Sequence, residues 1–263
     1  MVVQGVSDRV SNRAAVLGSP IRHSLSPMLH RAAYAALGLP GWCYEAFDCD
    51  EAGLPIFLEQ LGPEWVGLSL TMPLKRVALT VADEISPLAS AVGAANTLVF
   101  GRPGEHRRAE NTDVAGILAA LRELGEHAPT VLVRDPARTT DLGAAADRLG
   151  VQPMISGGLS NVELPEADVV ISTLPPGAAD VLSEQWRAAR WVTRPVVLDV
   201  VYTPWPTALA ASAIGAGCQT ISGLAVLLHQ AVAQVELMTG RRAPIAQMRA
   251  ALDAAVQSRS RPD

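Results

Sequence analysis

The chain is poor in lysine, aromatic residues and cysteine, and each shortage narrows what the protein can be. Of its 21 basic side chains, 20 are arginine, and Lys75 is the only lysine. Aromatic residues make up 4% of the 263 residues, so we expect a core built mostly from Ala, Val and Leu. The cysteines are odd in number and form no CxxC pair, which argues against a disulfide framework and for a reducing compartment. They are Cys43, Cys49 and Cys218.

Long apolar runs and an N-terminal signal segment are also missing from the sequence, so we expect a cytoplasmic protein that does not span a membrane. The net charge of -5 argues against binding to nucleic acid or to an anionic membrane surface. A small-molecule ligand is then the default expectation. No cluster of Cys and His has the spacing of metal ligands, so we expect no metal. The sequence leaves a homodimer open.

Strands alternate with helices along the chain, which predicts an α/β fold with mostly parallel sheets. Hydrophobic residues form 49% of the sequence, enough for a sizeable core. We expect an N-terminal α/β domain over 13–112, a second α/β domain over 113–222, and C-terminal helices over 223–257 that pack back on the first domain. Predicted strands cover 14–18, 42–48, 65–70, 97–100, 107–110, 130–134, 167–172 and 195–200. Predicted helices cover 26–37, 51–61, 73–81, 113–125, 141–149, 207–216, 224–238 and 243–255.

The single lysine is a candidate proton donor, because a lysine ammonium can shift its pKa whereas arginine stays charged. Lys75 follows the predicted strand 65–70, in the first turn of the next predicted helix. Thr71 and Lys75 should therefore point from the carboxyl edge of a sheet, where open α/β sheets bind ligands. Asp113 opens another helix; it is either an N-cap alone or the partner of Lys75 in passing a proton to a developing alkoxide. Asn96 is either a turn residue or an amide that holds a substrate hydroxyl.

Two hydroxyl groups lie just before and at the start of a predicted helix, in the segment GSPIRHSLSP. Ser24 and Ser26 are either plain helix caps or, with the positive helix end, a site for a carboxylate or phosphate. Ser26 is followed by Pro27, a residue that suits the first turn of a helix.

The motifs HSLSP, SLTMPLK, GAANT, NTD and SGLAVLLHQ occur in an order and spacing that resembles the shikimate dehydrogenase family, over residues 14–255. The resemblance implies an NADP-dependent oxidoreductase that reversibly reduces 3-dehydroshikimate to shikimate, in chorismate and aromatic amino-acid biosynthesis. It implies that Lys75 and Asp113 are the catalytic pair. The substrate contacts that it implies are Ser24, Ser26, Thr71, Asn96, Tyr202 and Gln230.

The sequence departs from the family where the dinucleotide should bind. A Rossmann-like domain needs a glycine-rich turn after its first strand, so that the backbone can approach the pyrophosphate. Here the helix predicted to end at Gly125 leads directly to the strand 130–134, with no GxGGxx between them. The second domain is therefore expected to lack its first strand, glycine loop and helix, about two dozen residues. The remaining family positions for NADP are Arg134, Arg138, Ser172, Thr173, Val200 and Gly223.

Three functions remain open at this point. The first is an NADP-dependent shikimate dehydrogenase, favoured by the presence of both Lys75 and Asp113. The second is a noncatalytic or cofactor-impaired homologue that binds shikimate or quinate, favoured by the missing glycine turn. The third is a quinate/shikimate dehydrogenase that uses NAD, against which Arg134 and Arg138 speak, since guanidinium groups suit the 2′-phosphate of NADP.

Overall fold

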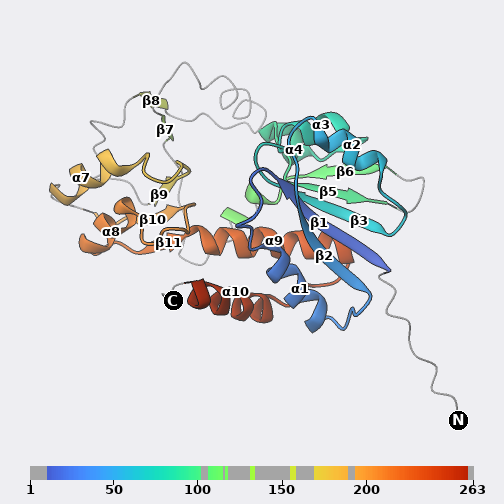
Figure 1. The fold of residues 1–263 in the computed structure, drawn as a ribbon. Helices are drawn as coiled ribbons and strands as arrows, with labels where there is room; N and C mark the ends of the chain where they lie inside the picture. Colours follow the sequence, from blue (N-terminus) through green and yellow to red (C-terminus); the bar gives the residue numbers. More distant parts are fainter. Residues whose placement is uncertain are drawn as a thin grey trace, which may run out of the picture. The chain divides into compact units, whose positions relative to one another are not determined.

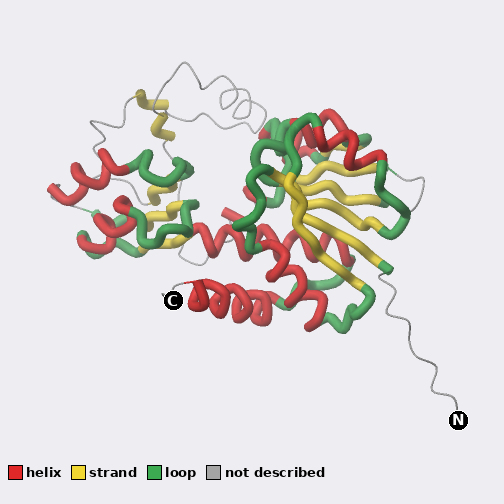
Figure 2. The backbone as a smooth tube through the Cα atoms, in the orientation of Figure 1, coloured by secondary structure: helices red, strands yellow, loops and turns green. Residues whose placement is uncertain are grey.

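The chain folds into two compact α/β units, as seen in a computed structural model (Figures 1 and 2). The structure describes residues 11–101, 106–114, 116–117, 131–133, 155–157, 169–188 and 193–259. The first unit comprises residues 1–115 and 230–263, and the second comprises residues 116–229. The boundary near residue 230 divides one long helix, α9 (Gly223–Thr239), so that its N-terminal turns belong to the second unit and its remainder to the first.

The first unit is built on a six-stranded sheet of order β2-β1-β3-β5-β6-β4. β1 lies between β2 and β3 and runs parallel to both. β5 is antiparallel to its neighbours β3 and β6, and β4 is parallel to β6. The strands are β1 (Asn12–Gly18), β2 (Trp42–Asp48), β3 (Trp65–Leu70), β4 (Glu84–Ile85), β5 (Thr97–Phe100) and β6 (Arg107–Glu110).

Helices cover both faces of this sheet, and the period of two along β1 decides which side chain meets which layer. Ala15 and Leu17 pack in a cluster with α2, α3 and α4, whereas Ala14 and Val16 pack on the other face with α1 and α9. α10 packs against α1. Figure 1 shows the helices on the two faces of the sheet. The helices are α1 (Ser26–Ala36), α2 (Gly53–Glu59), α3 (Val77–Val81), α4 (Pro87–Val92) and α10 (Ile245–Arg259).

The second unit contains a three-stranded parallel sheet of order β11-β10-β9 and a separate parallel pair, β7-β8. On one face, Val197 of β10 packs with Trp186 of α7 and Leu209 of α8. On the other face, Leu198 packs with Val226 of α9. The elements are β7 (Val131–Val133), β8 (Ile155–Gly157), β9 (Val169–Ser172), α7 (Asp180–Ala188), β10 (Val196–Asp199), α8 (Ala208–Gly215) and β11 (Thr220–Ser222).

The division of these strands into two sheets matches the removal of one particular strand. A doubly wound dinucleotide-binding sheet has the order 3-2-1-4-5-6, with the first strand in the middle. Removing strand 1 leaves strands 3 and 2 as one pair and strands 4, 5 and 6 as a separate sheet. The described strands form such a pair and such a triplet. Their arrangement agrees with a sequence that passes from the helix at Asp113 to β7 without a glycine turn.

Several predicted elements differ from the structure. Lys75 lies in the turns that precede α3 rather than in a first helical turn, because the helix begins only at Val77. Ser26 is not the N-cap of α1, since the helix already includes it and Leu25 holds the cap position without a side-chain hydrogen bond. The elements that the sequence analysis did not predict are β4, α4, β8, α7 and β11; the helix predicted over 141–149 lies outside the described residues.

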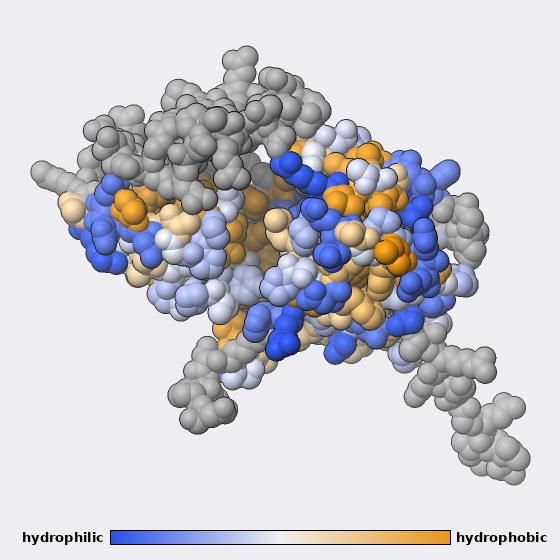
Figure 3. Space-filling view, turned by 45° about the horizontal axis from the view of Figure 1, so that its top comes forward, coloured by the Kyte–Doolittle hydropathy of each residue, from blue (hydrophilic) through white to orange (hydrophobic). Residues whose placement is uncertain are grey.

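Among the residues that were searched, no helix combines the length and the apolar composition needed to span a membrane. The face drawn in Figure 3 shows hydrophilic and hydrophobic residues interspersed over the described parts. Exposed large hydrophobic side chains such as Ile56 and Val181 belong to separate helices.

A buried histidine stands in the core between α1 and the sheet of the first unit. The ring of His30 is fully buried and stacks on Tyr44, with 3.9 Å between the ring centroids. Burial lowers the pKa of His30 to about 3 because the charged imidazolium would lose its hydration. His30 is therefore neutral in the folded protein, and Nε2 lies 3.3 Å from Oε1 of Gln234, an oxygen that can only accept.

This neutral histidine makes the stability of the protein depend on pH. The unfolded chain binds a proton at His30 near pH 6.5, whereas the folded chain does so only near pH 3, so acid between these values favours unfolding. Between pH 7 and pH 5 we expect His30 to contribute a loss of about 2 kcal/mol in the free energy of unfolding. Urea denaturation of wild type and His30→Gln at both pH values measures the difference. His23→Gln, at an exposed position, is the control and should keep the wild-type slope.

Candidate active site

The carboxyl ends of β1 and β3 lie side by side and begin two turns that touch. β1 and β3 are parallel neighbours, so both chains leave the sheet at the same edge. Gly18 ends β1, and a Cβ at this position would lie 2.3 Å from Cγ2 of Thr71, so the close approach requires glycine. The backbone N–H of Ser19 donates to the carbonyl of Met72 at 3.0 Å. The turns that carry Ser24 and Lys75 therefore start at one edge.

Lys75 and Asp113 form an ion pair at this end of the first unit. Nζ of Lys75 lies 2.8 Å from Oδ2 of Asp113, and the two side chains are 31% and 30% exposed. The helix-start contact is made by Asn111 instead, whose Oδ1 accepts from the backbone N–H of Val114 at 3.1 Å. The Asp113 carboxylate is thus engaged by Lys75 and not only by a helix N-terminus. A partly exposed lysine that is held by a carboxylate can deliver a proton to a neighbouring oxygen.

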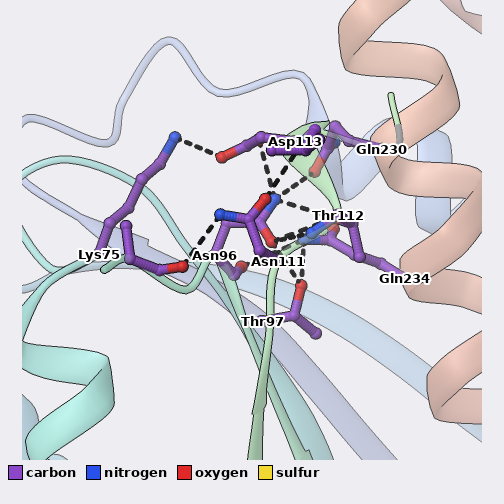
Figure 4. Close-up of polar contacts among 10 residues, drawn as sticks. Lys75, Asn96, Thr97, Asn111, Thr112, Asp113, Gln230 and Gln234 are labelled. Carbon is purple, nitrogen blue, oxygen red and sulfur yellow. Dashed lines mark hydrogen bonds and ion pairs between the residues drawn. The ribbon is translucent and has the colours of Figure 1, made fainter. Parts of the chain in front are cut away.

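Asn96 connects this pair to the rest of the unit (Figure 4). Its Nδ2 donates to Oδ1 of Asp113 and to Oγ1 of Thr112, both at 2.9 Å, and lies 3.4 Å from Oε1 of Gln230. Its Oδ1 accepts from the backbone N–H of Thr112 at 2.8 Å and from the hydroxyl of Thr97 at 3.0 Å. Asn96, the residue immediately before β5, therefore contacts the residues that follow β6 and helix α9. Four residues singled out from sequence, Lys75, Asn96, Asp113 and Gln230, form one connected group.

The two serines lie in the segment between β1 and α1. Oγ of Ser24 accepts from the backbone N–H of Ser26 at 3.3 Å, so Ser24 serves the start of the helix. Ser26 is buried, at 6% exposure. Thr71 lies half-buried directly after β3, and its backbone N–H donates to Leu17 at 2.9 Å. These three hydroxyls and the Lys75 group all belong to the first unit.

The remaining expected residues lie in the second unit or outside the described part of the chain. Tyr202 is half-buried, two residues after Val200. Ser172 ends β9, its carbonyl accepts from the N–H of Val200 at 3.0 Å, and Thr173 beyond it is exposed. Gly223 begins α9 so close to Val200 that a Cβ would lie 1.9 Å from the Val200 carbonyl oxygen. Arg134 and Arg138 lie outside the described residues.

Part of the second unit fits a dinucleotide, and part of it does not. Oγ of Ser172 is buried and has no hydrogen-bond partner within the described residues, at the carboxyl end of a parallel strand where such folds bind cofactors. The tight contact of Gly223 with Val200 brings the start of α9 to the end of β10. These features suit the nicotinamide end. The pyrophosphate end needs the glycine turn, and the sequence before β7 has none.

Two residues at the centre of the first unit were missed by sequence reasoning. Thr112 contacts Asn96 through both its backbone N–H and its hydroxyl. Gln234 is 1% exposed and donates to the carbonyl of Asn96 at 3.2 Å and to the hydroxyl of Thr97 at 2.9 Å. A signal for Gln234 was present in the sequence, because residues four apart share one face of a helix and Gln230 was already a candidate.

The fold and this group of residues define a two-unit α/β protein of the dehydrogenase type, and comparisons with known proteins specify which. Residues 16–98 match the family model for the shikimate dehydrogenase substrate binding domain, and residues 223–252 match that for the shikimate 5'-dehydrogenase C-terminal domain. The shikimate dehydrogenase (NADP(+)) of Moorella thermoacetica is 33% identical over an alignment that covers 89% of this chain and 90% of the relative. That of Methylobacterium radiotolerans is 35% identical and covers 88% and 92%.

Solved structures agree with these relatives. Shikimate dehydrogenase from Mycobacterium tuberculosis superposes with a TM-score of 0.82 at 42% identity, covering 93% of this chain and 99% of that one. The Thermus thermophilus enzyme in complex with shikimate gives a TM-score of 0.79 at 27% identity, covering 94% and 99%. The chain belongs to the shikimate dehydrogenase family, as its motifs predicted.

Two glycines in the second unit provide a matched test of the close contact at α9. Gly223→Ala would place Cβ against the Val200 backbone, which cannot move aside as a side chain can, so we expect a loss of about 1–3 kcal/mol in the free energy of unfolding. Gly215→Ala is the control, since nothing lies within 4 Å of its Cβ position in α8, and alanine there should stabilise by roughly 0.5–1 kcal/mol. Urea denaturation followed by circular dichroism compares the two. Equal stability of the two variants would contradict the contact.

Proposed function

We propose that this chain is an NADP-dependent shikimate dehydrogenase, which reversibly reduces 3-dehydroshikimate to shikimate in aromatic amino-acid biosynthesis. The observation that carries the proposal is the Lys75–Asp113 ion pair at 2.8 Å, held by Asn96 at the end of the first unit's sheet. Reduction of a ketone needs a proton donor for the oxygen, and the pairing of the chain's single lysine with Asp113 supports Lys75 as that donor. Membership of the family supports the same reaction.

Lys75 and Asp113 are proposed to be the catalytic pair. As the ketone oxygen gains negative charge, the Lys75 ammonium stabilises that charge and transfers a proton to the oxygen. Asp113 holds the ammonium in place through Oδ2 and receives an N–H from Asn96 at Oδ1, so both of its oxygens are fixed. In the reverse direction the neutral amine accepts the proton of the shikimate hydroxyl. A fixed pair lowers the cost of orienting groups during the reaction.

The substrate is proposed to bind through its carboxylate and its ring hydroxyls. Ser24 and Ser26 would donate to the carboxylate, next to the positive end of helix α1. The ring hydroxyls would be held by amide, hydroxyl and carboxylate groups of both polarities, which suits a group that both donates and accepts. These groups belong to Thr71, Asn96, Asp113 and Gln230, and Tyr202 is proposed to line the same site.

When bound, the reduced cofactor NADPH would supply the hydride to the ketone, and NADP+ would accept it in the reverse direction. Ser172, Thr173, Val200 and Gly223 are proposed to hold its nicotinamide end. The support for this is the buried Ser172 hydroxyl, which has no hydrogen-bond partner among the described residues, and the close contact of Gly223 with Val200. Arg134 and Arg138 are proposed to hold the 2′-phosphate by paired hydrogen bonds. We assign no residues to the pyrophosphate, because the glycine turn that normally binds it is absent from the sequence.

The missing turn favours a second candidate, a homologue that binds shikimate or quinate with little catalysis. The residues proposed to bind substrate lie mostly in the first unit, whereas the glycine turn would belong to the second, so we expect substrate binding not to require that turn. A dehydrogenase that uses NAD with quinate is less well supported, since Arg134 and Arg138 suit the phosphate that NAD lacks. We also propose a cytoplasmic location, which the three free cysteines support. A homodimer is proposed as well, and light scattering tests it.

Substitution of Lys75 tests the proton-transfer step. We expect Lys75→Ala to reduce turnover of shikimate by a factor of about 10² or more while changing shikimate affinity little. Lys75→Arg is the matched variant, because it keeps the positive charge and cannot give up a proton at the assay pH. It should bind shikimate and remain slow. Near-normal turnover in Lys75→Arg would remove the proton-transfer role of Lys75.

Cofactor titration separates the proposed enzyme from the binding homologue. We expect calorimetry to detect shikimate binding, and NADP binding about ten- to a hundred-fold weaker than in a relative that has the glycine turn, because hydrogen bonds to the pyrophosphate are lost. Nicotinamide absorbance with shikimate and saturating NADP should still rise. Shikimate binding without any NADP binding or absorbance change would establish the binding homologue instead. Faster reduction of NAD than of NADP would favour the third candidate.

A further inference from the structure

Gln234 lies at the centre of a buried polar chain that leads to Asp113. It is on α9, one helical turn after Gln230, and is 1% exposed. Its Oε1 accepts from the hydroxyl of Ser69 on β3 at 2.8 Å, and its Nε2 donates to the hydroxyl of Thr97 on β5 at 2.9 Å. An amide with three or more polar contacts inside a core is expensive to misplace, so its orientation is strongly determined.

The backbone fixes which way the Gln234 amide points. The carbonyl oxygen of Asn96 lies 3.2 Å from Nε2 of Gln234, and a carbonyl can only accept a hydrogen bond. The opposite amide orientation would bring two oxygens together. Oε1 must therefore face Ser69, and since Oε1 can only accept, the Ser69 hydroxyl donates to it. Ser69 in turn accepts from the hydroxyl of Tyr44 at 2.6 Å.

The same reasoning fixes the chain on the other side of Gln234. The hydroxyl of Thr97 accepts from Nε2 of Gln234, so its own proton is directed to Oδ1 of Asn96, 3.0 Å away. Asn96 cannot turn over, because its Oδ1 also accepts from the backbone N–H of Thr112 at 2.8 Å. Its Nδ2 is thereby left facing Oδ1 of Asp113 at 2.9 Å.

Every donor in this chain points the same way. It begins at Tyr44 and passes through Ser69, Gln234, Thr97 and Asn96 to the carboxylate that holds Lys75. All five donors are at most 3% exposed. Hydrogen bonds in such a directional chain polarise one another, and low local dielectric strengthens them. Figure 4 shows the final members from Gln234 to Asp113.

We propose that Gln234 is a positioning residue for the reaction: through Thr97 it holds the Asn96 amide against Asp113, and through α9 it holds Gln230 beside Asn96. It touches neither substrate nor cofactor. Its effect on catalysis rests on the proposed function, because Asn96, Asp113 and Gln230 are there assigned to substrate and to Lys75. The hydrogen-bond chain itself is a property of the first unit and can be measured without any turnover.

Substitutions that keep shape and remove one polar group test this role. We expect Gln234→Met to lower kcat for shikimate oxidation about tenfold and to raise the KM for shikimate only a few-fold. Thr97→Val, which removes the hydroxyl between Gln234 and Asn96, should have a similar effect, and Thr97→Ser should restore most of the activity. Because both substitutions interrupt the same series of hydrogen bonds, the double variant should be no slower than the slower single variant, as in a double-mutant cycle of coupled residues.

Ser86→Ala is the control for loss of stability alone. Ser86 is buried in the same unit, and its hydroxyl caps α4 by accepting from the N–H of Ala89, which is not a member of the hydrogen-bond chain from Tyr44 to Asp113. This variant should unfold more easily and keep the wild-type kcat. If Gln234→Met and Thr97→Val retain the wild-type kcat, or lose activity only as their additive sum, the positioning role is overturned.

A spectroscopic measurement keeps this result apart from the proposed function. The side-chain NH₂ resonances of Asn96 in ¹⁵N-labelled protein, assigned by their loss in Asn96→Asp, should shift in Gln234→Met and Thr97→Val and return in Thr97→Ser. Unshifted Asn96 resonances in both variants would contradict the proposed hydrogen-bond connection from Gln234 to Asn96. If wild type neither binds shikimate nor reduces NADP, the proposed function fails, while shifts in these resonances still establish that Gln234 acts on Asn96.

Discussion

The hydrogen bonding of the Asn96 side chain is the constraint on which the polar arrangement of the first unit depends. Asn96 is 2% exposed, and a buried amide without partners would cost about 1–3 kcal/mol for each group left unsatisfied. Its partners are the adjacent residue Thr97 in β5 and two distant parts of the chain, the residues after β6 and helix α9. The antiparallel register of β5 and β6 pairs Thr97 with Glu110, and this register brings Thr112 and Asp113, the residues after β6, beside Asn96.

The sequence predicted the regular parts of this unit because their patterns are local. β2, β3, β5 and β6 were predicted with the boundaries that the structure has; alternation indicated β2, and the turn sequence Gly-Arg-Pro-Gly indicated the strands on either side of it, β5 and β6. The prediction failed where elements are short or depend on packing: β4 has two residues, and α4 was missed although Ser86-Pro87 is a helix-start pair. Lys75 was predicted to lie in the first turn of a helix over 73–81, yet α3 begins only at Val77.

The candidate site was predictable in part for the same reason. Motif order indicated Lys75, Asn96, Asp113 and Gln230, and the structure brings these four into contact. Gln234 carries no motif. Its importance arises only when α9 is packed on the sheet, so that one amide reaches β3 and β5 together. The spacing of four from Gln230 places Gln234 on the same helix face, but it does not indicate which groups of the sheet its amide contacts.

Substrate binding and hydride transfer make different demands on this chain, which explains how one can be retained while the other is weakened. The contacts among Lys75, Asn96, Asp113 and Gln230 form within the first unit, so the pair and its supporting amides need no glycine turn. The cofactor's phosphates need backbone N–H groups at a turn and at a helix start. In a dinucleotide-binding sheet both follow the central first strand, and the described strands of the second unit include no such strand. Removing a central strand destabilises the sheet in addition to removing the turn, because two strand edges lose their hydrogen-bond partners. We therefore expect the departure from the family to weaken the affinity for the cofactor and to leave the proton-transfer geometry unchanged.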